Sequence, residues 1–326
     1  MAIMAFRDAL RTALYEEMER DERVFVIGEE VGRYGGAYAV TKGLIDKFGS
    51  MRLVDTPISE ASIVGLGVGA AITGLRPVVE LMYVDFIGLA MDQIANQMAK
   101  LRYMTGGQLA IPMVLRTQGG TGRSAGAQHS QSLEAMLAHI PGLRIVMPSN
   151  PADAKGLLKT AIRSDDPVVF IEHKALYSVK GEVPEGEYLI PLGKAAIPRE
   201  GSDLTIITYS RMTAVCLEAA EKLAAEHGIF AEVIDIRTLN PLDMTTIAQS
   251  VKKTKRAVVV TEAHKTAGFS AELSARISEL CFSDLVSSVV RVAAKDVPVP
   301  ASHLEKFSIP TVEEIVQNSL ALVQGR

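Results

Sequence analysis

Three observations predict an α/β fold in two domains. Short apolar runs rich in Val and Ile alternate with segments of helical periodicity along most of the chain. The runs are continuously apolar, which is typical of parallel strands buried on both faces. The alternation pauses over residues 178–203, a stretch rich in Pro, Gly and charge that we interpret as a linker. We therefore expect two three-layer α/β/α domains, residues 1–190 and 191–326.

The first domain is expected to begin with an amphipathic helix. Apolar residues recur at helical spacing from Phe6 to about Arg20, and the strand-like VFVI at 24–27 follows at once. Further strands are expected at 52–55, 77–81, 112–117, 144–148 and 167–173, and helical character at 59–74, 87–103, 132–139 and 151–163.

The second domain repeats the alternation after the linker. Strands are expected at 204–210, 231–238, 257–263 and 289–293, and helices near 211–226, 244–252 and 269–280. A smaller α/β domain therefore closes the chain.

Composition and charge exclude several classes of protein. Hydrophobic residues make up 48% and charged residues 22%, as in soluble globular proteins. A net charge of -4 leaves no broad positive field for nucleic acid or anionic lipid, and the basic run at 252–256 is typical of a solvated helix end. No segment has the length of a membrane span or the form of a signal peptide. We expect a cytoplasmic protein, although a removed targeting segment would leave no trace.

The chain contains two cysteines, Cys216 and Cys281, each within an apolar helical pattern. Two buried thiols are a better interpretation than a disulfide or a metal pair, and they fit a reducing compartment.

Glu60 is an unusual carboxylate, because it precedes a segment of small and apolar residues, DTPISEASIVG at 55–65. Ser59 is a plausible N-cap, so Glu60 could simply complement the helix dipole in an exposed first turn. The helix that follows has little side-chain bulk and would let a backbone or a flat ligand approach closely. Its GLGVGA stretch is no dinucleotide fingerprint, since the glycines lie within the helix, and we interpret it as close packing.

A Gly-rich loop supplies the second candidate site. RTQGGTGRSAGAQHSQSLEAMLAHIPG at 116–142 ends a strand and delivers His129 ahead of a short helix. Such loops at the carboxyl edge of a parallel sheet are where α/β proteins bind ligands. The loop could cradle a phosphate, but the Lys-Ser/Thr pair of a P-loop is missing. His139, His173, His227, His264 and His303 fit surface or packing positions.

Met82 and Phe86 lie at the corner between the strand ending in ELMYVDF and the next helix. They could form an apolar wall for a ligand or belong to the core. The sequence contains neither a zinc-type Cys/His cluster nor a G-x-S-x-G elbow.

Longer motifs carry a resemblance over nearly the whole chain. ISEASIVGLGVGAAITGLRPVVELMYVDFIGLAMDQIANQMAK, AQHSQSLEAMLAHIPGLRIVMPSNPADAKGLLKTAI, DIRTLNPLD and VVVTEAH closely resemble the β subunit of E1, the thiamine-diphosphate component of 2-oxo acid and acetoin dehydrogenase complexes. The resemblance implies a transketolase-like pyrimidine-binding domain followed by a transketolase C-terminal-like domain. It also implies decarboxylation of pyruvate or cleavage of acetoin, with acyl transfer to a lipoyl group.

The resemblance assigns roles to individual residues. Glu60 would hydrogen-bond a ring nitrogen of the aminopyrimidine and favour the imino tautomer that deprotonates the thiazolium. Phe86 would stack on this ring, Ile58 and Met82 would line its pocket, and His129 would stand near the reacting carbon. A carboxylate that shares a proton with a weakly basic nitrogen must be desolvated, and we expect burial to outweigh the opposing helix dipole.

Metal ions and partners follow from the same resemblance. A potassium ion is implied at Met113, Ala161, Ile162, Ser164 and Asp166, mostly through backbone carbonyls. The Gly-Asp-Gly segment that holds Mg²⁺ and the diphosphate is missing from this chain, so an α subunit must supply that half of the site. The expected assembly is an α2β2 heterotetramer with a β-β contact, docked on an E2 lipoyl acyltransferase core.

Two other functions compete with this interpretation. The separate C-terminal half of a split transketolase would use Glu60 and Phe86 similarly, but the loop around His129 fits E1 better. A non-catalytic α/β nucleotide-binding subunit would need a phosphate loop between a strand and a helix, which the sequence lacks. Pyruvate and acetoin are not distinguished by the sequence, because much of the substrate pocket lies in the α chain.

Overall fold

The computed structural model describes residues 1–325, which form two compact units. The first unit comprises residues 1–119 and 136–192, and the second comprises residues 120–135 and the chain from Gly193 onward. The division after Leu192 is close to the expected boundary at residue 190. The assignment of residues 120–135 to the second unit was not expected, since this segment interrupts the first unit in sequence.

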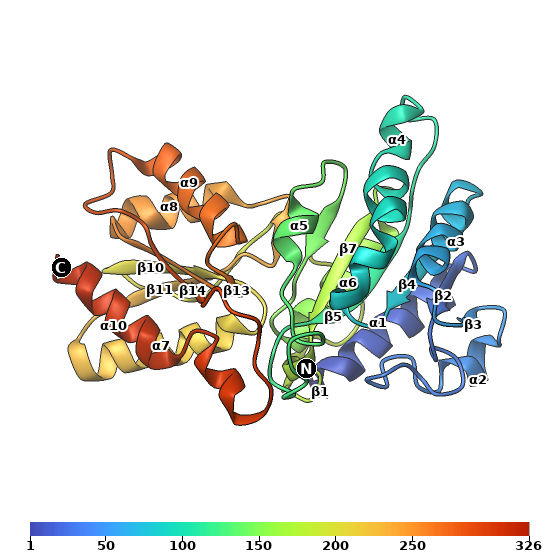
Figure 1. Ribbon diagram of the computed structural model, residues 1–326, viewed down its shortest axis with the longest axis horizontal. Coiled ribbons are helices and arrows are strands. Elements are labelled where there is room, and N and C mark those ends of the chain that lie inside the picture. The colour runs from blue at the N-terminus through green and yellow to red at the C-terminus, as the bar shows by residue number, and fades with distance from the viewer. Residues whose placement is uncertain (326) are drawn as a thin grey trace. The chain divides into compact units, whose positions relative to one another are not determined.

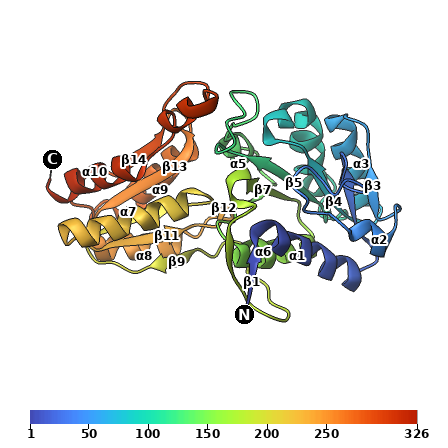
Figure 2. The same ribbon diagram turned by 90° about the horizontal axis from the view of Figure 1, so that it is seen from below.

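The first unit contains a parallel sheet with helices on both faces. Its elements are β1 (Ala2–Ala5), α1 (Phe6–Arg20), β2 (Val24–Gly28), α2 (Leu44–Phe48), β3 (Leu53–Asp55), α3 (Glu60–Ile72), β4 (Arg76–Leu81), η1 (Val84–Ala90), η2 (Gln93–Met98), α4 (Leu101–Met104), β5 (Val114–Gly119), β6 (Arg144–Val146), α6 (Pro151–Arg163), β7 (Val168–His173), η3 (Lys174–Leu176) and β8 (Lys180–Val183). Six strands pair in parallel in the order β6-β7-β5-β4-β2-β3. Helices α1 and α6 cover one face, and α3 packs with η1 and η2 on the other (Figure 2).

Apolar burial holds the helices to this sheet. Phe6, Leu10 and Leu14 of α1 are fully buried in one cluster with Leu157 and Leu158 of α6. On the other face, a Cβ at Gly67 of α3 would lie 2.5 Å from Val79 Cγ2 and 2.9 Å from Met113 Cε. Gly67 thus permits close packing on the sheet, as expected from GLGVGA, whereas a Cβ at Gly69 would meet nothing within 4 Å.

The second unit contains a smaller sheet. The elements of this unit are β9 (Ala196–Arg199), β10 (Leu204–Thr208), α7 (Met212–His227), β11 (Ala231–Asp235), β12 (Thr238–Asn240), α8 (Met244–Thr254), β13 (Ala257–His264), α9 (Phe269–Cys281), β14 (Val290–Ala294), η4 (Ser302–Phe307) and α10 (Val312–Val323). The inserted segment, residues 120–135, ends at the start of α5 (Glu134–Ala138). The strand order is β14-β13-β10-β11-β9, in which the edge strand β9 is antiparallel. Helices α7 and α10 lie on one face, with α8 and α9 on the other (Figure 1).

The structure differs from the expected elements at several points. The helix expected at 87–103 is instead a 3₁₀ helix, η1, followed by a π-helix, η2, and the short α4. The expected linker at 178–203 contains strands β8 and β9. Helix α10 was not predicted, although Thr311 and Glu314 form a capping box at its start.

The other inferences from composition agree with the structure. Cys216 and Cys281 are buried, free thiols, and burial raises the pKa of Cys216 to about 12. The basic run marks the end of α8, where Lys253 forms an ion pair with Glu232 and Lys255 adopts a left-handed conformation. Within residues 1–325, no helix has the length and apolar character needed to cross a membrane.

Candidate functional site

The carboxyl edge of the first sheet carries the main group of candidate residues. The chain passes from β2 to β3 on one side, then crosses by α3 to β4 on the other side of β2. The carboxyl ends of β2 and β4 are therefore the point where strand order reverses, and open α/β sheets bind ligands there. Glu60 follows β3, and Met82 and Phe86 follow β4, so the topology brings the predicted residues of this unit to one edge.

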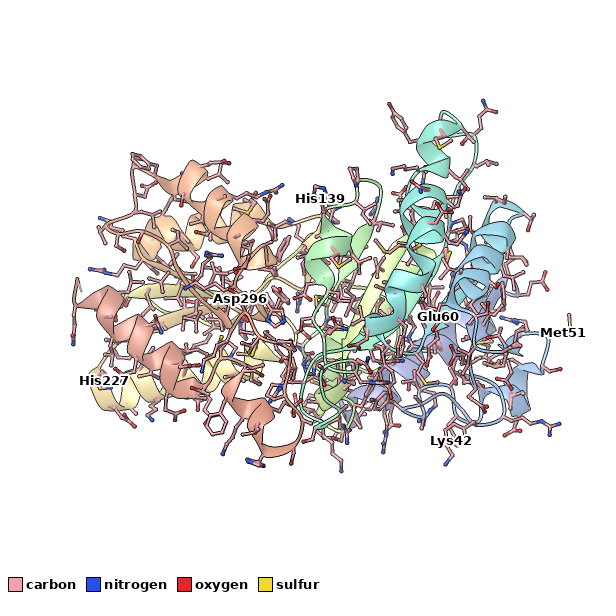
Figure 3. All side chains as sticks on the ribbon, viewed as in Figure 1. Lys42, Met51, Glu60, His139, His227 and Asp296 are labelled. Atoms are coloured by element: carbon pink, nitrogen blue, oxygen red, sulfur yellow. The ribbon has the colours of Figure 1, made fainter. Side chains whose placement is uncertain are left out.

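Glu60 is the first residue of α3 and is only 8% exposed. Figure 3 labels it at the start of that helix. Ser59 occupies the N-cap position, but its hydroxyl donates to Ser62 Oγ at 2.9 Å and caps no backbone N–H. The side chain of the neighbouring Ile58 is 78% exposed, so an apolar surface lies beside a buried carboxylate. Glu60 therefore does lie in the first turn of a helix, but the interpretation that it is exposed there is wrong.

Glu29, which sequence reasoning missed, is a second carboxylate at this edge. It follows the last residue of β2, and its Oε1 is buried without a hydrogen-bond partner among the described residues. Burial, then the negative charges of Glu60 and Glu80, raise the pKa of Glu29. An unpaired buried carboxylate oxygen is costly in a folded protein and is a common mark of a functional site.

A buried ion network underlies this edge. Arg116 of β5 is fully buried and donates to Glu80 at 2.6 Å and to both oxygens of Glu172 at 2.7 and 2.9 Å. Tyr177 donates to Glu172 at 2.6 Å. Although burial alone would lower it, the two carboxylates raise the pKa of Arg116. The signal in the sequence was a charged residue among the apolar residues of each of three strands, Glu80, Arg116 and Glu172, with opposite signs on neighbouring strands.

The corner after β4 has a strained backbone. Tyr83 has a φ of 96°, which is rare for a bulky side chain. Its ring contacts Tyr38 edge-on at 6.3 Å, and the Lys174 ammonium lies 5.4 Å from its centroid. The Phe86 N–H donates to the Tyr83 carbonyl at 3.1 Å, and Met82 and Phe86 are both half-buried. Strained backbones of this kind cluster at ligand sites, and this one lies between β4 and η1, the element that carries Phe86.

His129 belongs to the second unit and lies in the inserted segment. It is half-buried, and its N–H donates to the Gly126 carbonyl at 3.3 Å. Three of the loop's amides do not face a phosphate, because Thr121, Gly122 and Ser124 donate theirs to Glu262 and Glu305. The phosphate cradle considered from the sequence is thus filled by the protein's own carboxylates.

A cavity of about 410 Å³ lies beside this loop in the second unit. Its lining comprises Ala127, Gln131, His264, Thr266, Asp296, Val297, Pro298 and Val299. His264 Nδ1 lies 2.7 Å from the Lys295 carbonyl, and Thr266 donates to Asp296 at 2.7 Å. His264 had been assigned from the sequence to an ordinary position, whereas it ends β13 at the carboxyl edge of the sheet and lines a cavity.

The five residues named for potassium lie around the end of α6 and the start of β5 and β7. The Ile162 and Ser164 carbonyls accept from Arg76 at 3.0 and 3.1 Å, and the Ala161 carbonyl accepts from the Ser164 N–H at 3.1 Å. The Met113 carbonyl accepts from Val168 at 3.0 Å. Each carbonyl retains a second lone pair, so these contacts leave room for a cation ligand, and the potassium site stays a prediction.

The carboxylate of Asp166, the fifth of these residues, forms ion pairs with Arg102 and Arg144. Across residues 1–325 no cluster of three or more His, Cys, Asp or Glu side chains could hold a metal ion. His139 and His227 are exposed at the ends of their helices, in agreement with their expected surface positions (Figure 3).

Two family models match the chain in succession, and the first of them includes residues 120–135, which the structure assigns to the second unit. Residues 2–180 match the family model of the transketolase pyrimidine-binding domain, and residues 193–315 match that of the transketolase C-terminal domain. Among solved structures, a split-gene transketolase described as an inactive beta4 tetramer aligns with a TM-score of 0.81 at 23% identity, covering 98% of this chain and 99% of that chain. Transketolase from Leishmania mexicana aligns with a TM-score of 0.70 at 17% identity, covering 100% of this chain and 46% of that one. These likenesses show the fold.

Curated relatives are much closer in sequence. The chain is 52% identical over 310 residues to the pyruvate dehydrogenase E1 component subunit beta of Porphyra purpurea, covering 95% of this chain and 93% of the relative. It is 46% identical over 318 residues to the 2-oxoisovalerate dehydrogenase subunit beta of Bacillus subtilis, covering 97% of each.

Proposed function

Because this chain belongs to the family of E1 β subunits of pyruvate and other 2-oxo acid dehydrogenases, we propose that it provides the pyrimidine half of a thiamine-diphosphate site. The substrate that we propose is pyruvate, with acetoin and 2-oxoisovalerate as the alternatives to be tested. The acyl group would pass to the lipoyl group of an E2 partner, and an E1 α subunit would supply the diphosphate half of the site.

The observation that carries this proposal is the burial of Glu60 at the switch point of the sheet. Thiamine diphosphate, when bound, supplies the nucleophilic carbon that attacks the substrate carbonyl. Glu60 would hold the proton shared with a ring nitrogen of the aminopyrimidine, and its low exposure keeps water from competing for that proton. The exposed Ile58 and the half-buried Met82 and Phe86 supply the apolar surfaces that a flat ring requires.

His129 is proposed to stand near the reacting carbon. An imidazole can both donate and accept a hydrogen bond, which suits a group that assists acyl transfer to a dithiolane. Glu29, with its unpaired oxygen and raised pKa, adds a second proton-holding carboxylate next to Glu60.

The proposed metal ions divide between the subunits. Mg²⁺ needs acidic and carbonyl oxygens near the diphosphate, and we assign it to the α subunit because this chain lacks the Gly-Asp-Gly segment. Potassium is proposed at the carbonyls of Met113, Ala161, Ile162 and Ser164 with Asp166. A cation bound only by the folded chain raises the unfolding temperature, so replacing KCl by choline chloride should lower the Tm. An unchanged Tm would contradict the proposal of a potassium site.

The first test compares wild type with Glu60→Gln after co-expression with an E1 α subunit. Thiamine-diphosphate-dependent dye reduction and acylation of a lipoyl domain would be measured with pyruvate, acetoin and 2-oxoisovalerate. Loss of a positioned general acid-base group is expected to reduce kcat by about 100-fold or more.

Glu22→Gln, an exposed carboxylate of the same unit, is the matched control and should retain wild-type rates. Equal turnover by wild type and Glu60→Gln would return Glu60 to a structural role. Ketol transfer to an aldose without lipoyl acylation would instead identify a split transketolase.

A further inference from the structure

The His129 loop, residues 120–131, has an alternating backbone. The Gly120 N–H donates to the Gln131 carbonyl at 2.9 Å and closes the loop at its base. Gly120, Gly122, Ser124 and Gly126 have φ angles of 81°, 96°, 55° and 77°, and no residue between them has a positive φ. Such alternation turns successive N–H groups toward one side and forms a concave anion-binding nest.

The anions in this nest are two carboxylates of the second unit. Glu262 of β13 accepts the Thr121 N–H at 2.6 Å. Glu305 of η4 accepts the Gly122 N–H at 2.7 Å and the Ser124 N–H at 3.2 Å, one on each oxygen. Both carboxylates are 8% exposed, and hydrogen bonds to ionised groups are stronger where water is excluded.

Two further side chains hold the segment that contains the loop. The Arg211 guanidinium donates to Thr121 Oγ1 at 2.7 Å and lies 3.4 Å from Glu262. Tyr209 donates to Glu134 at 2.7 Å where the segment enters α5, and both side chains are buried. The segment is therefore attached at both ends and along its first five residues.

These anchors lie at the switch point of the second sheet. After β10 the chain crosses by α7 to β11 on one side, and after β13 it crosses by α9 to β14 on the other. Tyr209 and Arg211 follow β10, and Glu262 lies near the end of β13. The carboxyl ends of such a strand pair are where open α/β domains bind ligands, and here Glu262 and Arg211 hold the protein's own loop there.

We propose that Glu262, Glu305 and Arg211 form a clamp of positioning residues that orders the His129 loop before any cofactor binds. The proposal rests on the proposed function only for the role of His129 in catalysis. The clamp fixes the backbone on the N-terminal side of His129, and the Gly120–Gln131 hydrogen bond fixes the other side. Glu262 and Glu305 touch neither substrate nor cofactor in this scheme and act through the loop.

Limited trypsin digestion of the full chain without thiamine diphosphate measures loop order directly, because Arg123 lies within the loop. The wild-type chain should resist cleavage after Arg123. In Glu305→Gln one carboxylate oxygen becomes an NH2 group, which cannot accept the backbone N–H that it faces, and we expect the initial cleavage rate to rise about tenfold. Glu262→Gln should act in the same direction.

Glu279→Gln is the matched control. Glu279 is an exposed residue on α9 of the same unit, and its substitution removes the same charge as Glu305→Gln. Cleavage after Arg123 should therefore stay at the wild-type rate. If the Glu variants fail to fold, Thr121→Val removes only the hydroxyl that Arg211 contacts, and we expect a smaller increase in cleavage in the same place. Unchanged cleavage after Arg123 in all folded variants would overturn the clamp.

The catalytic consequence is measured in the complex with the α subunit. If the clamp positions His129, Glu305→Gln should change the ratio of lipoyl acylation to dye reduction in the direction in which His129→Asn changes it. General destabilisation would lower both rates equally. Faster cleavage with an unchanged ratio would overturn the positioning role. If wild type shows no thiamine-diphosphate-dependent activity, the proposed function fails, while the cleavage rates still decide on the clamp.

Discussion

Glu29 shows how much of a site can depend on a single unpaired atom. Glu60 was selected from the sequence because a carboxylate at the start of a small-residue helix is unusual, whereas Glu29 follows a strand as many surface carboxylates do. Its burial comes from neighbours distant in sequence, including Glu60 and Glu80. Local sequence patterns do not report such burial, so reasoning from the sequence found one carboxylate of the pair.

The raised pKa of Glu29 gives a testable pH dependence. The pKa of Glu29 is raised in the folded chain above the ordinary value of 4.5 for a glutamate. Between pH 4.5 and this raised pKa, the folded chain therefore binds more protons than the unfolded chain. The free energy of unfolding falls as the pH rises through this interval. Glu29→Gln removes this loss. We expect the Tm of the variant relative to wild type to be about 1–3 °C higher at pH 8 than at pH 5.

Thermal unfolding followed by circular dichroism at both pH values would measure this difference, with the exposed Glu22→Gln as control. An identical difference between variant and wild type at pH 5 and pH 8 would contradict the assigned environment of Glu29.

At the scale of elements, helix α3 contains two glycines with opposite requirements. A Cβ at Gly67 would lie 2.5 Å from Val79 Cγ2, whereas a Cβ at Gly69 would meet nothing within 4 Å. Gly67→Ala should therefore destabilise the chain by about 1–3 kcal/mol through overpacking. Gly69→Ala should stabilise it by about 0.5–1 kcal/mol, because alanine loses less backbone entropy in a helix.

Urea unfolding of the two variants and wild type, each as the isolated chain, provides the measurement. The same chemical change gives opposite signs only if α3 packs on the sheet through Gly67. Equal destabilisation by both substitutions would contradict this packing.

Most elements could be predicted because their signals are local. Most strands of both sheets coincide with apolar runs, and α6 spans residues 151–163 as its periodicity indicates, whereas β9 has no such run. The segment at 87–103 was predicted only as helical, because its spacing does not distinguish the 3₁₀ and π geometry of η1 and η2 from an α-helix. β8 lies in a polar, Gly-containing stretch, and its pairing with β1 depends on a partner almost 180 residues away in sequence.

At the scale of the whole molecule, the sequence indicated two domains, but it did not indicate that one segment within the first belongs to the second. Residues 120–135 interrupt the first unit and belong to the second because their hydrogen-bond partners, such as Glu262 and Glu305, are in the second. A Gly-rich loop carries no local mark of the unit to which it attaches. The sequence predicted where the loop begins and that it bears His129.

The first unit exposes several large apolar side chains that an assembly would cover. Ile58 is 78% exposed, Leu66 59%, Leu89 64%, Tyr103 89% and Met104 69%. Exposed apolar surface on this scale is typical of protein interfaces. After co-purification with an E1 α subunit, light scattering should give the mass of two 35.0 kDa chains plus two partner chains.

The isolated chain should be inactive in the same preparation conditions, because it lacks the diphosphate half of the site. A monomeric chain with full thiamine-diphosphate-dependent activity would contradict both the assembly and the shared site.

The clamp on the His129 loop also has a consequence for the order of events at the ribosome. Gly122 is synthesised long before Glu305, from which it is separated by 183 positions in the chain. Chains are made from the N-terminus, so the strands of the first unit can pair before Glu262 and Glu305, the carboxylates that bind this loop, have been synthesised. The nest acquires its last carboxylate only when Glu305 of η4 has been made, roughly 10–40 seconds after Gly122 at typical synthesis rates. Until then the nascent chain carries a solvated, protease-sensitive loop, and a truncated message would leave it permanently in that state.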